Sequence, residues 1–247
     1  KAVIIGSVLV GIGVIIGFIG IAIGGFKFPN GAVDLTTMKA LHTEKKTVQI
    51  ADAFDKIEIA GASSMDIEIC KSKTGKNYVE YYDTDDWTSH VDVKDHVLKF
   101  TTDDKGKHKA IVSLGFGKDT RTRIYLTDAE YKEIAVTTLS GYVTIQDVNA
   151  ETVNVSASSG DLYMKNINVP DSIMATSSSG DIDLENATAK QIELGANSGD
   201  IEMQDITAES LRMSTSSGDI DLESCDAEKF DITTSSGDVD MEITAGR

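Results

Sequence analysis

Aspartate residues recur at a near-constant interval in the C-terminal half of the chain. A Ser-Gly dipeptide occurs six times, at intervals of 19, 20, 19, 19 and 19 residues, and five copies are followed by aspartate: Asp161, Asp181, Asp200, Asp219 and Asp238. The first copy has Tyr142 instead. Carboxylates stacked about 5 Å apart repel one another unless they are hydrogen-bonded, screened or bridged by cations. The repeat therefore predicts a column of carboxylates whose charge must be compensated.

Two kinds of chemistry could compensate this column. Calcium accepts several carboxylate oxygens at flexible geometry, and more acids lie close by in the repeats: Asp183, Glu185, Glu202, Asp221, Glu223, Asp240 and Glu242. The sequence lacks, however, the G-G-x-G-x-D nonapeptide of calcium-binding β-rolls. The alternative is that each aspartate accepts hydrogen bonds from turn N–H groups, while the other acids form a solvated face. We expect no obligatory cofactor, and Ca2+ at the column is the open alternative.

Catalytic and metal-binding motifs are absent from the sequence. G-x-S-x-G, P-loop and H-E-x-x-H motifs do not occur, and no cysteine or histidine stands at metal-ligand spacing from any of the four histidines, His42, His90, His96 and His108. A polysaccharide-acting β-helix enzyme would need an irregular cluster of acids and bases. The basic residues of the repeats are instead scattered: Lys165, Lys190, Arg212, Lys229 and Arg247. We therefore expect a non-catalytic surface, with an enzyme that uses the acidic face as the alternative.

Short β-strands are the elements that must position the aspartates. Within each repeat, apolar or small residues alternate in two runs; after Gly199 these positions are Ile201, Met203, Ile206, Ala208, Leu211 and Met213. Two period-2 runs joined by a frame shift predict two strands that meet at a corner, each with one buried face. Such a unit cannot bury its apolar face alone, so successive units must stack. We predict an all-β fold, a β-solenoid of ~19-residue two-strand coils, in which the recurrent glycine lies at a corner that needs positive φ or close backbone approach.

The repeat is weaker upstream and defines the domain organisation. Residues 54–70 resemble one degenerate coil, residues 91–99 predict a hairpin, and pairs at Ile111/Val112 and Ile124/Leu126 predict further strands. We assign 137–247 to the regular solenoid, 48–136 to its degenerate N-terminal region and 27–47 to a linker. The last repeat reaches only its first strand, so we expect a further segment or a partner to cover that end.

The N-terminal segment has the composition of a membrane span. Residues 2–26 contain no charged residue, and at about 1.5 Å per residue they suffice to cross a hydrocarbon core of about 30 Å. We predict a transmembrane helix within residues 1–26, in contact with the lipid bilayer. Five glycines share one face of this helix: Gly6, Gly13, Gly17, Gly20 and Gly24. They form either a packing surface for a second copy or a membrane-protein partner, or a lipid-facing surface.

Charge and cysteine content exclude other classes of protein. The formal net charge is −17, and because acidic surfaces repel phosphate, we expect no nucleic-acid partner. The acidity is concentrated in residues 140–247, which hold 21 Asp and Glu against 5 Lys and Arg. Two cysteines, Cys70 and Cys225, are too few for a disulfide framework. We expect two free thiols, at least one of them buried.

The stretch RIYLTDAEYKEIAVTTLSGYVTI, from Arg123 to Ile145, followed by the SSGD units, resembles a widespread bacterial family. Its members are membrane-anchored β-solenoid proteins of unassigned function, often called adhesins, and some occur in cell-envelope-stress operons. Thr127 and Tyr142 depart from the family pattern, which more often has proline and aspartate there. The resemblance implies a solenoid outside the cytoplasm, held by a single pass in the cell membrane. It implies an interaction or scaffold module that contacts an envelope component, and it carries over no catalytic residues.

Overall fold

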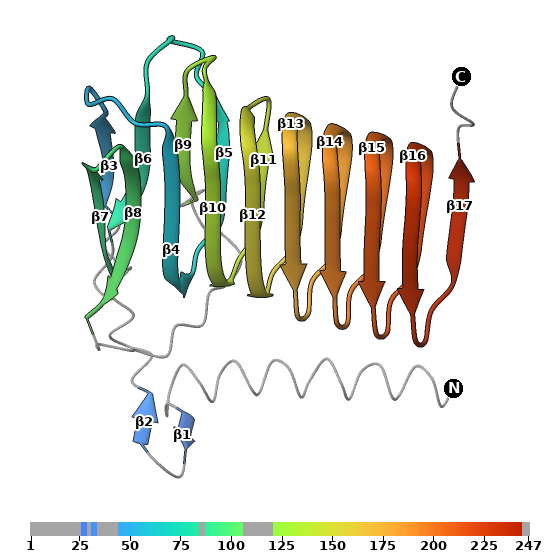
Figure 1. Cartoon of the computed structure of the whole chain (residues 1–247). Coiled ribbons are helices and arrows are strands. Elements are labelled where there is room, and N and C mark those ends of the chain that lie inside the picture. Colours follow the sequence, from blue (N-terminus) through green and yellow to red (C-terminus); the bar gives the residue numbers. More distant parts are fainter. Residues whose placement is uncertain (1–25, 29–30, 34–43, 84–86, 106–120, 244–247) are drawn as a thin grey trace, which may run out of the picture. The chain divides into compact units, whose positions relative to one another are not determined.

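The computed structural model describes residues 26–28, 31–33, 44–83, 87–105 and 121–243 (Figure 1). The chain divides into two units. In the first unit, the described residues form an antiparallel pair of β1 (Phe26–Phe28) and β2 (Gly31–Val33). All other described strands belong to the second unit, which is the solenoid.

The second unit consists of fifteen strands in one continuous sheet that folds back on itself. The strands before the regular repeats are β3 (Glu44–Gln49), β4 (Lys56–Ser64), β5 (Ile67–Lys71), β6 (Tyr78–Asp83), β7 (Trp87–Lys94), β8 (Val97–Asp104) and β9 (Thr122–Leu126). Those of the repeats are β10 (Glu130–Ser140), β11 (Val143–Gln146), β12 (Asn149–Ser159), β13 (Leu162–Ser177), β14 (Ile182–Ala196), β15 (Ile201–Thr215), β16 (Ile220–Thr234) and β17 (Val239–Ile243).

These strands form two layers, as Figure 1 shows. Layer one contains β3, β6, β9, β5, β11, the first halves of β13 to β16, and β17. Layer two contains β7, β8, β4, β10, β12 and the second halves of β13 to β16. Each long strand therefore bends at a corner and contributes to both layers. The predicted all-β solenoid with two strands in each coil is confirmed.

Parallel pairing at a constant register builds the stack. Ile182 pairs with Ile201, and Ile201 pairs with Ile220, each 19 residues further on. The single 20-residue interval has a local cause, because the register between β13 and β14 shifts between Val169 and Ser172. One extra residue at Pro170–Asp171 is thus accommodated as a bulge, and the coils above and below keep their alignment.

The core lies between the layers and consists of the alternating residues predicted from the sequence. Like residues stack on like, and Ile182, Ile201 and Ile220 are completely buried. Small residues stack in a second column beside the corner, where Ala189, Ala208 and Ala227 are successive register partners and Ala189 is buried. Burial of a large aliphatic side chain stabilises a fold by about 1.5–3 kcal/mol, so repetition of these positions stabilises the whole stack.

The corner glycines are required because successive coils touch there. A Cβ atom on Gly180, Gly199 or Gly218 would lie 2.0–2.3 Å from the carbonyl oxygen of the corner glycine in the preceding coil. Of the six repeat glycines only Gly141 has positive φ, at 111°. Two reasons were predicted for glycine at the corners. Close backbone approach requires glycine throughout the repeats, whereas a left-handed backbone conformation requires it at the first corner alone.

The degenerate N-terminal region continues the stack, but not in chain order. The coil of β4 and β5 is present as predicted, and it lies between the coil of β10 and β11 and an outer coil of β8 and β9. The predicted hairpin is β7–β8, whose two-residue turn has positive φ at Asp95 and His96. Antiparallel strands finish this end: β6 and β3 in layer one and β7 in layer two.

Several predicted segments lie outside the described residues. These are the membrane helix at residues 1–25 with its five glycines, and the strand at Ile111/Val112. Phe26 begins β1, and Glu44 to Thr47, at the end of the expected linker, belong to β3. Among the residues that the structure describes, no helix is long and apolar enough to cross a membrane.

Candidate functional site: the acidic face of layer one

The aspartate column forms a ladder of hydrogen bonds along one corner of the stack. The backbone N–H of Asp181 donates to Oδ1 of Asp161 at 3.0 Å, and that of Asp200 donates to Oδ1 of Asp181 at 2.9 Å. Asp219 and Asp238 continue the pattern at 2.8 Å each. Tyr142, which replaces the first aspartate, still donates its N–H to Oδ1 of Asp66 at 3.0 Å. Each carboxylate from Asp161 to Asp219 thus binds the next coil. Asp66 makes the same bond before the sequence repeat begins, and Tyr142, which has no carboxylate, interrupts the ladder between the two parts.

This ladder accounts for the turn chemistry predicted for the column. Oδ1 of each aspartate from Asp161 to Asp219 is occupied by an N–H group of the protein. Within the described ranges, no three His, Cys, Asp or Glu side chains gather in a way that could hold a metal ion. Calcium binding stays a prediction, and it would have to use the second oxygen of each carboxylate.

Two further columns of side chains cover the outer surface of layer one. One runs through Tyr163, Asp183, Glu202, Asp221 and Asp240, which are successive register partners. The other runs beside it through Lys165, Glu185, Gln204, Glu223 and Glu242. We call this surface the acidic face. It joins five strands, β13 to β17, from successive coils, so neighbouring carboxylates come from residues about 19 positions apart in sequence.

A shallow groove of about 420 Å³ lies on the acidic face. It is lined by Tyr163, Asp183, Leu184, Glu185, Glu202, Met203, Gln204, Asp221 and Glu223. Seven of the nine lining side chains belong to the two columns, so the groove is a product of the regular stack and not of an inserted loop. Its chemistry is that of an acceptor surface for cations and hydrogen-bond donors.

Asp183 and Glu185 have opposite electrostatic environments within this groove. Burial raises the pKa of the half-buried Asp183 carboxyl to about 6, and the charges of Glu202, Asp181 and Asp161 act in the same direction. The Lys165 ammonium lies 2.5 Å from Oε1 of Glu185, and the Tyr163 hydroxyl donates to Oε2 at 2.9 Å. These two contacts lower the pKa of Glu185. The Glu185 carboxyl is therefore held ionised, whereas the neighbouring Asp183 carboxyl binds a proton at a higher pH than an ordinary aspartate does.

Towards the N-terminal end, layer one carries balanced charge. Arg123 Nε lies 2.9 Å from Oε2 of Glu68, and Arg121 reaches the same oxygen at 3.5 Å. Lys45 pairs with Glu80 at 3.0 Å in the outer strands. The outer surface of layer one therefore changes from paired charge over β3, β6, β9 and β5 to an excess of carboxylates over β14 to β17, as the sequence balance predicted.

A second ladder, at the opposite corner, was missed in the sequence. Five residues with positive φ, between 50° and 56°, recur there at the coil interval: Asp147, Asn166, Asn186, Asp205 and Ser224. Asn166 Nδ2 donates to Oδ1 of Asp147, and Asn186 Nδ2 donates to Oδ1 of Asn166, both at 2.8 Å. Asn and Asp tolerate this left-handed conformation better than other residues. Their recurrence every 19 or 20 residues was the available signal.

The histidines and cysteines form no site in the described residues. His90 Nε2 lies 3.1 Å from Asp103 Oδ2 in an exposed pair, and His96 occupies the β7–β8 turn. His42 and His108 lie outside the described residues. Both cysteines are free and buried, as predicted. Burial raises the pKa of Cys70 to about 11 and also raises that of Cys225, so these thiols are poor nucleophiles at neutral pH.

Comparison with known proteins identifies relatives of this fold. The model of the Toastrack family, DUF4097, matches residues 54–244. A crystal structure from Bacteroides fragilis, named a "putative adhesin", has a TM-score of 0.51 and 18% sequence identity over 81% of this chain and 96% of that one.

Two further solved structures are less similar. A "putative adhesin" from Parabacteroides merdae has a TM-score of 0.45, with 12% identity over 81% of this chain and 96% of that one. A "putative lipid binding protein" from Parabacteroides distasonis has a TM-score of 0.38, with 18% identity over 81% and 97%. These two are too distant to carry an argument. Among curated proteins, none matches the sequence.

Proposed function

Because the chain belongs to the Toastrack family, we propose that it is a non-catalytic interaction module of the bacterial cell envelope, similar to an adhesin or scaffold. The observation that carries this proposal is the regularity of the stack. From β10 to β17 the coils repeat their side chains at one register and present extended, continuous surfaces. Extended repeat surfaces of this kind are used for binding. The neighbour from Bacteroides fragilis, named a "putative adhesin", supports the same class of function.

The proposal places the solenoid outside the cytoplasm, anchored by a single membrane pass within residues 1–26. The support is the uncharged segment from residue 2 to residue 26, which is long enough to span a bilayer. Its glycine surface would bind a second copy or a membrane-protein partner, through which the module takes part in envelope-stress sensing. A helix-association assay in membranes tests this part: Gly17→Leu and Gly20→Leu should weaken association, and unchanged association removes it.

The acidic face is the surface that we propose for an envelope component. Residues 140–247 hold 21 acids against 5 bases, so direct binding of an anionic wall polymer is disfavoured unless a divalent cation intervenes. Calcium is therefore proposed as an external bridging ion, not as a resident cofactor.

Retention of the full chain on insoluble cell wall, in detergent, tests this function. Retention should rise with millimolar calcium and fall with EDTA at fixed ionic strength. The variant Asp221→Asn/Glu223→Gln removes two exposed carboxylates and should reduce the calcium effect. Lys165→Gln/Glu185→Gln removes an ion pair without net change of charge and is the matched control. Retention no greater than that of an unrelated acidic protein in both conditions would contradict the proposal.

A polysaccharide-acting enzyme is the second candidate, and the raised pKa of Asp183 beside Glu202 favours it. A general acid and a neighbouring carboxylate are the groups that glycoside hydrolysis requires. Against a lyase, which would need a Lys or Arg beside the carboxylates, Lys165 is the only such residue in the two columns and is bound to Glu185. Release of reducing ends from wall glycans, abolished by both Asp183→Asn and Glu202→Gln, would establish the enzyme; we expect no release.

A further inference from the structure

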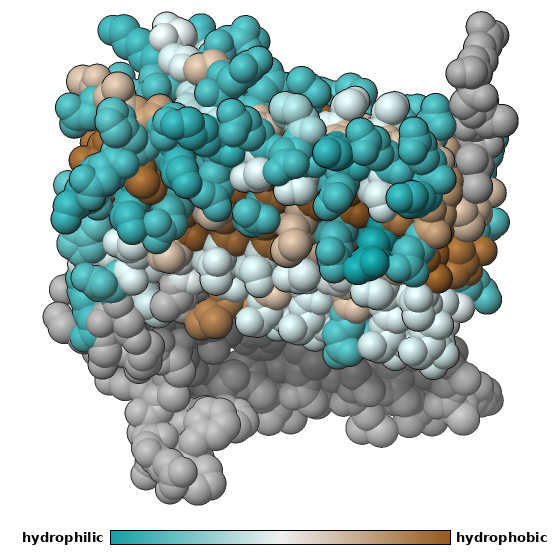
Figure 2. All heavy atoms as spheres, in the orientation of Figure 1, coloured by the Kyte–Doolittle hydropathy of each residue, from teal (hydrophilic) through white to brown (hydrophobic). Residues whose placement is uncertain are grey.

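The connection between β5 and β6 carries positive charge in a strongly acidic molecule. Residues 71–77 read KSKTGKN, with three lysines and no acid. Figure 1 shows this connection rising beyond the neighbouring turns at the top of the stack, and Figure 2 shows hydrophilic side chains at the same place. Lys71, Lys73 and Lys76 are all exposed. We call residues 71–77 the basic turn.

Hydrogen bonds hold the backbone of the basic turn in place. The N–H of Ser72 donates to the Leu126 carbonyl at 2.6 Å, and the N–H of Thr74 donates to Ser72 Oγ at 3.3 Å. At the other end of the turn, Asn77 Oδ1 accepts a bond from the N–H of Thr127 at 2.7 Å. The lysines are therefore presented on a fixed backbone, so their binding to a partner requires little ordering of the chain.

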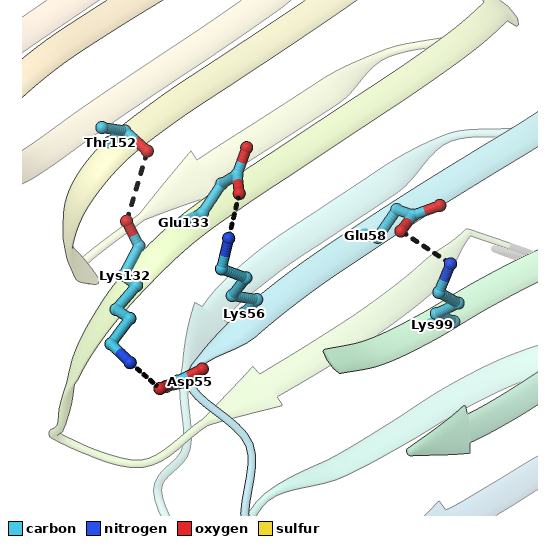
Figure 3. Close-up of polar contacts among 7 residues, drawn as sticks. All are labelled: Asp55, Lys56, Glu58, Lys99, Lys132, Glu133 and Thr152. Carbon is cyan, nitrogen blue, oxygen red and sulfur yellow. Dashed lines mark hydrogen bonds and ion pairs between the residues drawn. The ribbon is translucent and has the colours of Figure 1, made fainter. Parts of the chain in front are cut away.

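Other lysines of the N-terminal region are neutralised by a neighbouring acid. Figure 3 shows three such ion pairs: Lys56 with Glu133, Lys99 with Glu58, and Lys132 with Asp55. In the basic turn, Lys71 has a partner of this kind, Asp128 at 2.8 Å. Lys73 and Lys76 form no ion pair with the residues that the structure describes. Two exposed ammonium groups of this turn are therefore available to an anionic partner.

The groove of the acidic face has carboxylates without cations. At its N-terminal end a lysine already fills this role, because Lys165 is bound to Glu185. One and two coils further on, the groove is lined by Glu202, Asp221 and Glu223, which are exposed and form no ion pair within the described ranges. Successive carboxylates of one column are about 4.8 Å apart. This part of the groove is therefore open to ammonium groups that its own coils do not supply.

The basic turn and the groove cannot meet within one chain. Both belong to the second unit of the chain. In layer one, the strand order from the turn to the groove is β5, β11, β13, β14 and β15. Four steps of about 4.8 Å place β15 about 19 Å from β5, which is farther than a lysine side chain extends. The basic turn can therefore reach this groove only on another molecule.

We propose that the basic turn of one copy of this chain binds in the groove of a second copy, with the Lys73 and Lys76 ammonium groups on the carboxylates of Glu202, Asp221 and Glu223. This inference rests on the proposed role of the acidic face as a binding surface, and it names a protein partner for that face. The contact is head-to-tail, so each pair keeps one free turn and one free groove, and further copies extend it into a row. Anchoring of all copies in one membrane, as proposed above, would raise their effective concentration.

Complementary charge reversals test this contact. The turn variant is Lys73→Glu/Lys76→Glu, and the face variant is Asp221→Lys/Glu223→Lys; all four side chains are exposed. In sedimentation of the full chain in detergent, the parent protein should self-associate as its concentration rises. Each variant alone should associate about tenfold more weakly, because its turn and its groove then carry the same sign of charge. An equal mixture of the two variants should associate again, because the turn of each variant then meets a groove of opposite charge.

The assay conditions separate this contact from the other proposed interactions. Every protein carries Gly17→Leu/Gly20→Leu, so that the proposed glycine surface of the membrane segment supplies no association. The control Lys190→Glu/Lys229→Glu changes the charge by the same amount at exposed lysines outside the turn and should associate like the parent protein. Association should weaken in about 0.5 M NaCl, because salt screens exposed charges. Calcium should weaken it too, because calcium binds the same carboxylates, whereas calcium should increase wall retention.

Each other outcome decides against the proposal or against the wall-binding role. A parent protein that stays monomeric overturns the proposal, and so does self-association that both variants leave unchanged. A mixture that fails to associate, although circular dichroism shows both variants folded, overturns it as well. If the turn variant loses wall retention but sediments like the parent protein, an anionic wall component occupies the turn instead. Wall retention without self-association removes this contact alone, whereas self-association without wall retention removes the wall-binding role and leaves the contact standing.

Discussion

Gly199→Ala is the sharpest test of how the coils are held together. The added Cβ would lie 2.2 Å from the carbonyl oxygen of Gly180 and 2.6 Å from its carbonyl carbon. Cβ atoms essentially never approach another heavy atom more closely than 3.0 Å, so the two coils must separate by at least about 0.8 Å at this corner. Both neighbours are backbone atoms, and no side-chain rotation can relieve the contact.

The cost follows from the hydrogen bonds at the same corner. Separation weakens the bond from Asp200 N–H to Asp181 Oδ1 at 2.9 Å. It also weakens the bond from Ile182 N–H to the Asp200 carbonyl at 2.9 Å. At about 1 kcal/mol for each of these two bonds, with about 1–3 kcal/mol for overpacking, the free energy of unfolding should fall by about 3–5 kcal/mol. The melting temperature should fall by on the order of 10 °C.

Gly195→Ala in the same coil is the matched control. A Cβ there would lie 3.7 Å from Ser214 Oγ and from Thr176 Cγ2, which is ordinary contact. This variant should be neutral or more stable by about 0.4–1 kcal/mol, because alanine restricts the unfolded chain. Urea unfolding followed by circular dichroism measures both variants. If Gly199→Ala were as stable as Gly195→Ala, the idea that close backbone approach at the corner determines the glycine would be refuted.

Three further predictions concern the corner and the groove. Asp200→Ala should lose the bond from the Asp219 N–H and about 1 kcal/mol of stability, whereas Asp200→Asn keeps an acceptor and should unfold near the wild-type urea midpoint; equal losses would contradict the ladder. Ala196 occupies the position at which neighbouring coils have a Ser or Thr hydroxyl that donates to a corner carbonyl. Ala196→Ser should therefore add such a bond to the Gly180 carbonyl and raise the free energy of unfolding by about 0.5–1 kcal/mol. An unchanged or lower free energy of unfolding would contradict this prediction. Because the pKa of Asp183 is about 6 in the folded chain and about 4 when unfolded, protonation favours folding, and this stability is present below about pH 4 and is lost as pH rises through 6. Asp183→Asn should therefore stabilise the protein at pH 7.5 by about 1 kcal/mol, a value reduced for solvent screening because the side chain is only half-buried, and by much less at pH 4. Urea unfolding at the two pH values would detect this difference.

The order of the coils was the part of the fold that local patterns could not supply. Residues 54–70 were recognised as a coil from alternating Ile57/Ile59 and Ile67/Ile69. Their place between β8–β9 and β10–β11 depends on which strand edges pair. A period-2 pattern identifies the buried face of a strand, but it does not state which neighbour the strand will have.

The candidate site could likewise be predicted from the sequence only in part. Regular spacing placed Asp161 to Asp238 in one column, because in a parallel stack a fixed interval means a fixed position. Whether those carboxylates bind cations or N–H groups depended on the orientation of the backbone at the corner, which brings each N–H to within 3.0 Å of the preceding carboxylate. The groove and the raised pKa of Asp183 likewise arise from burial among neighbouring coils.

The sequence alone determined the all-β class, the length of the coil, the inward residues of each strand and the acidic character of one surface. These properties are local or periodic, and the hydrophobic effect acts on them in every coil alike. Tertiary structure decided the order of the first coils and the left-handed ladder through Asn166 and Asn186. Each of these depends on contacts between residues far apart in sequence, whose energies only the assembled stack defines.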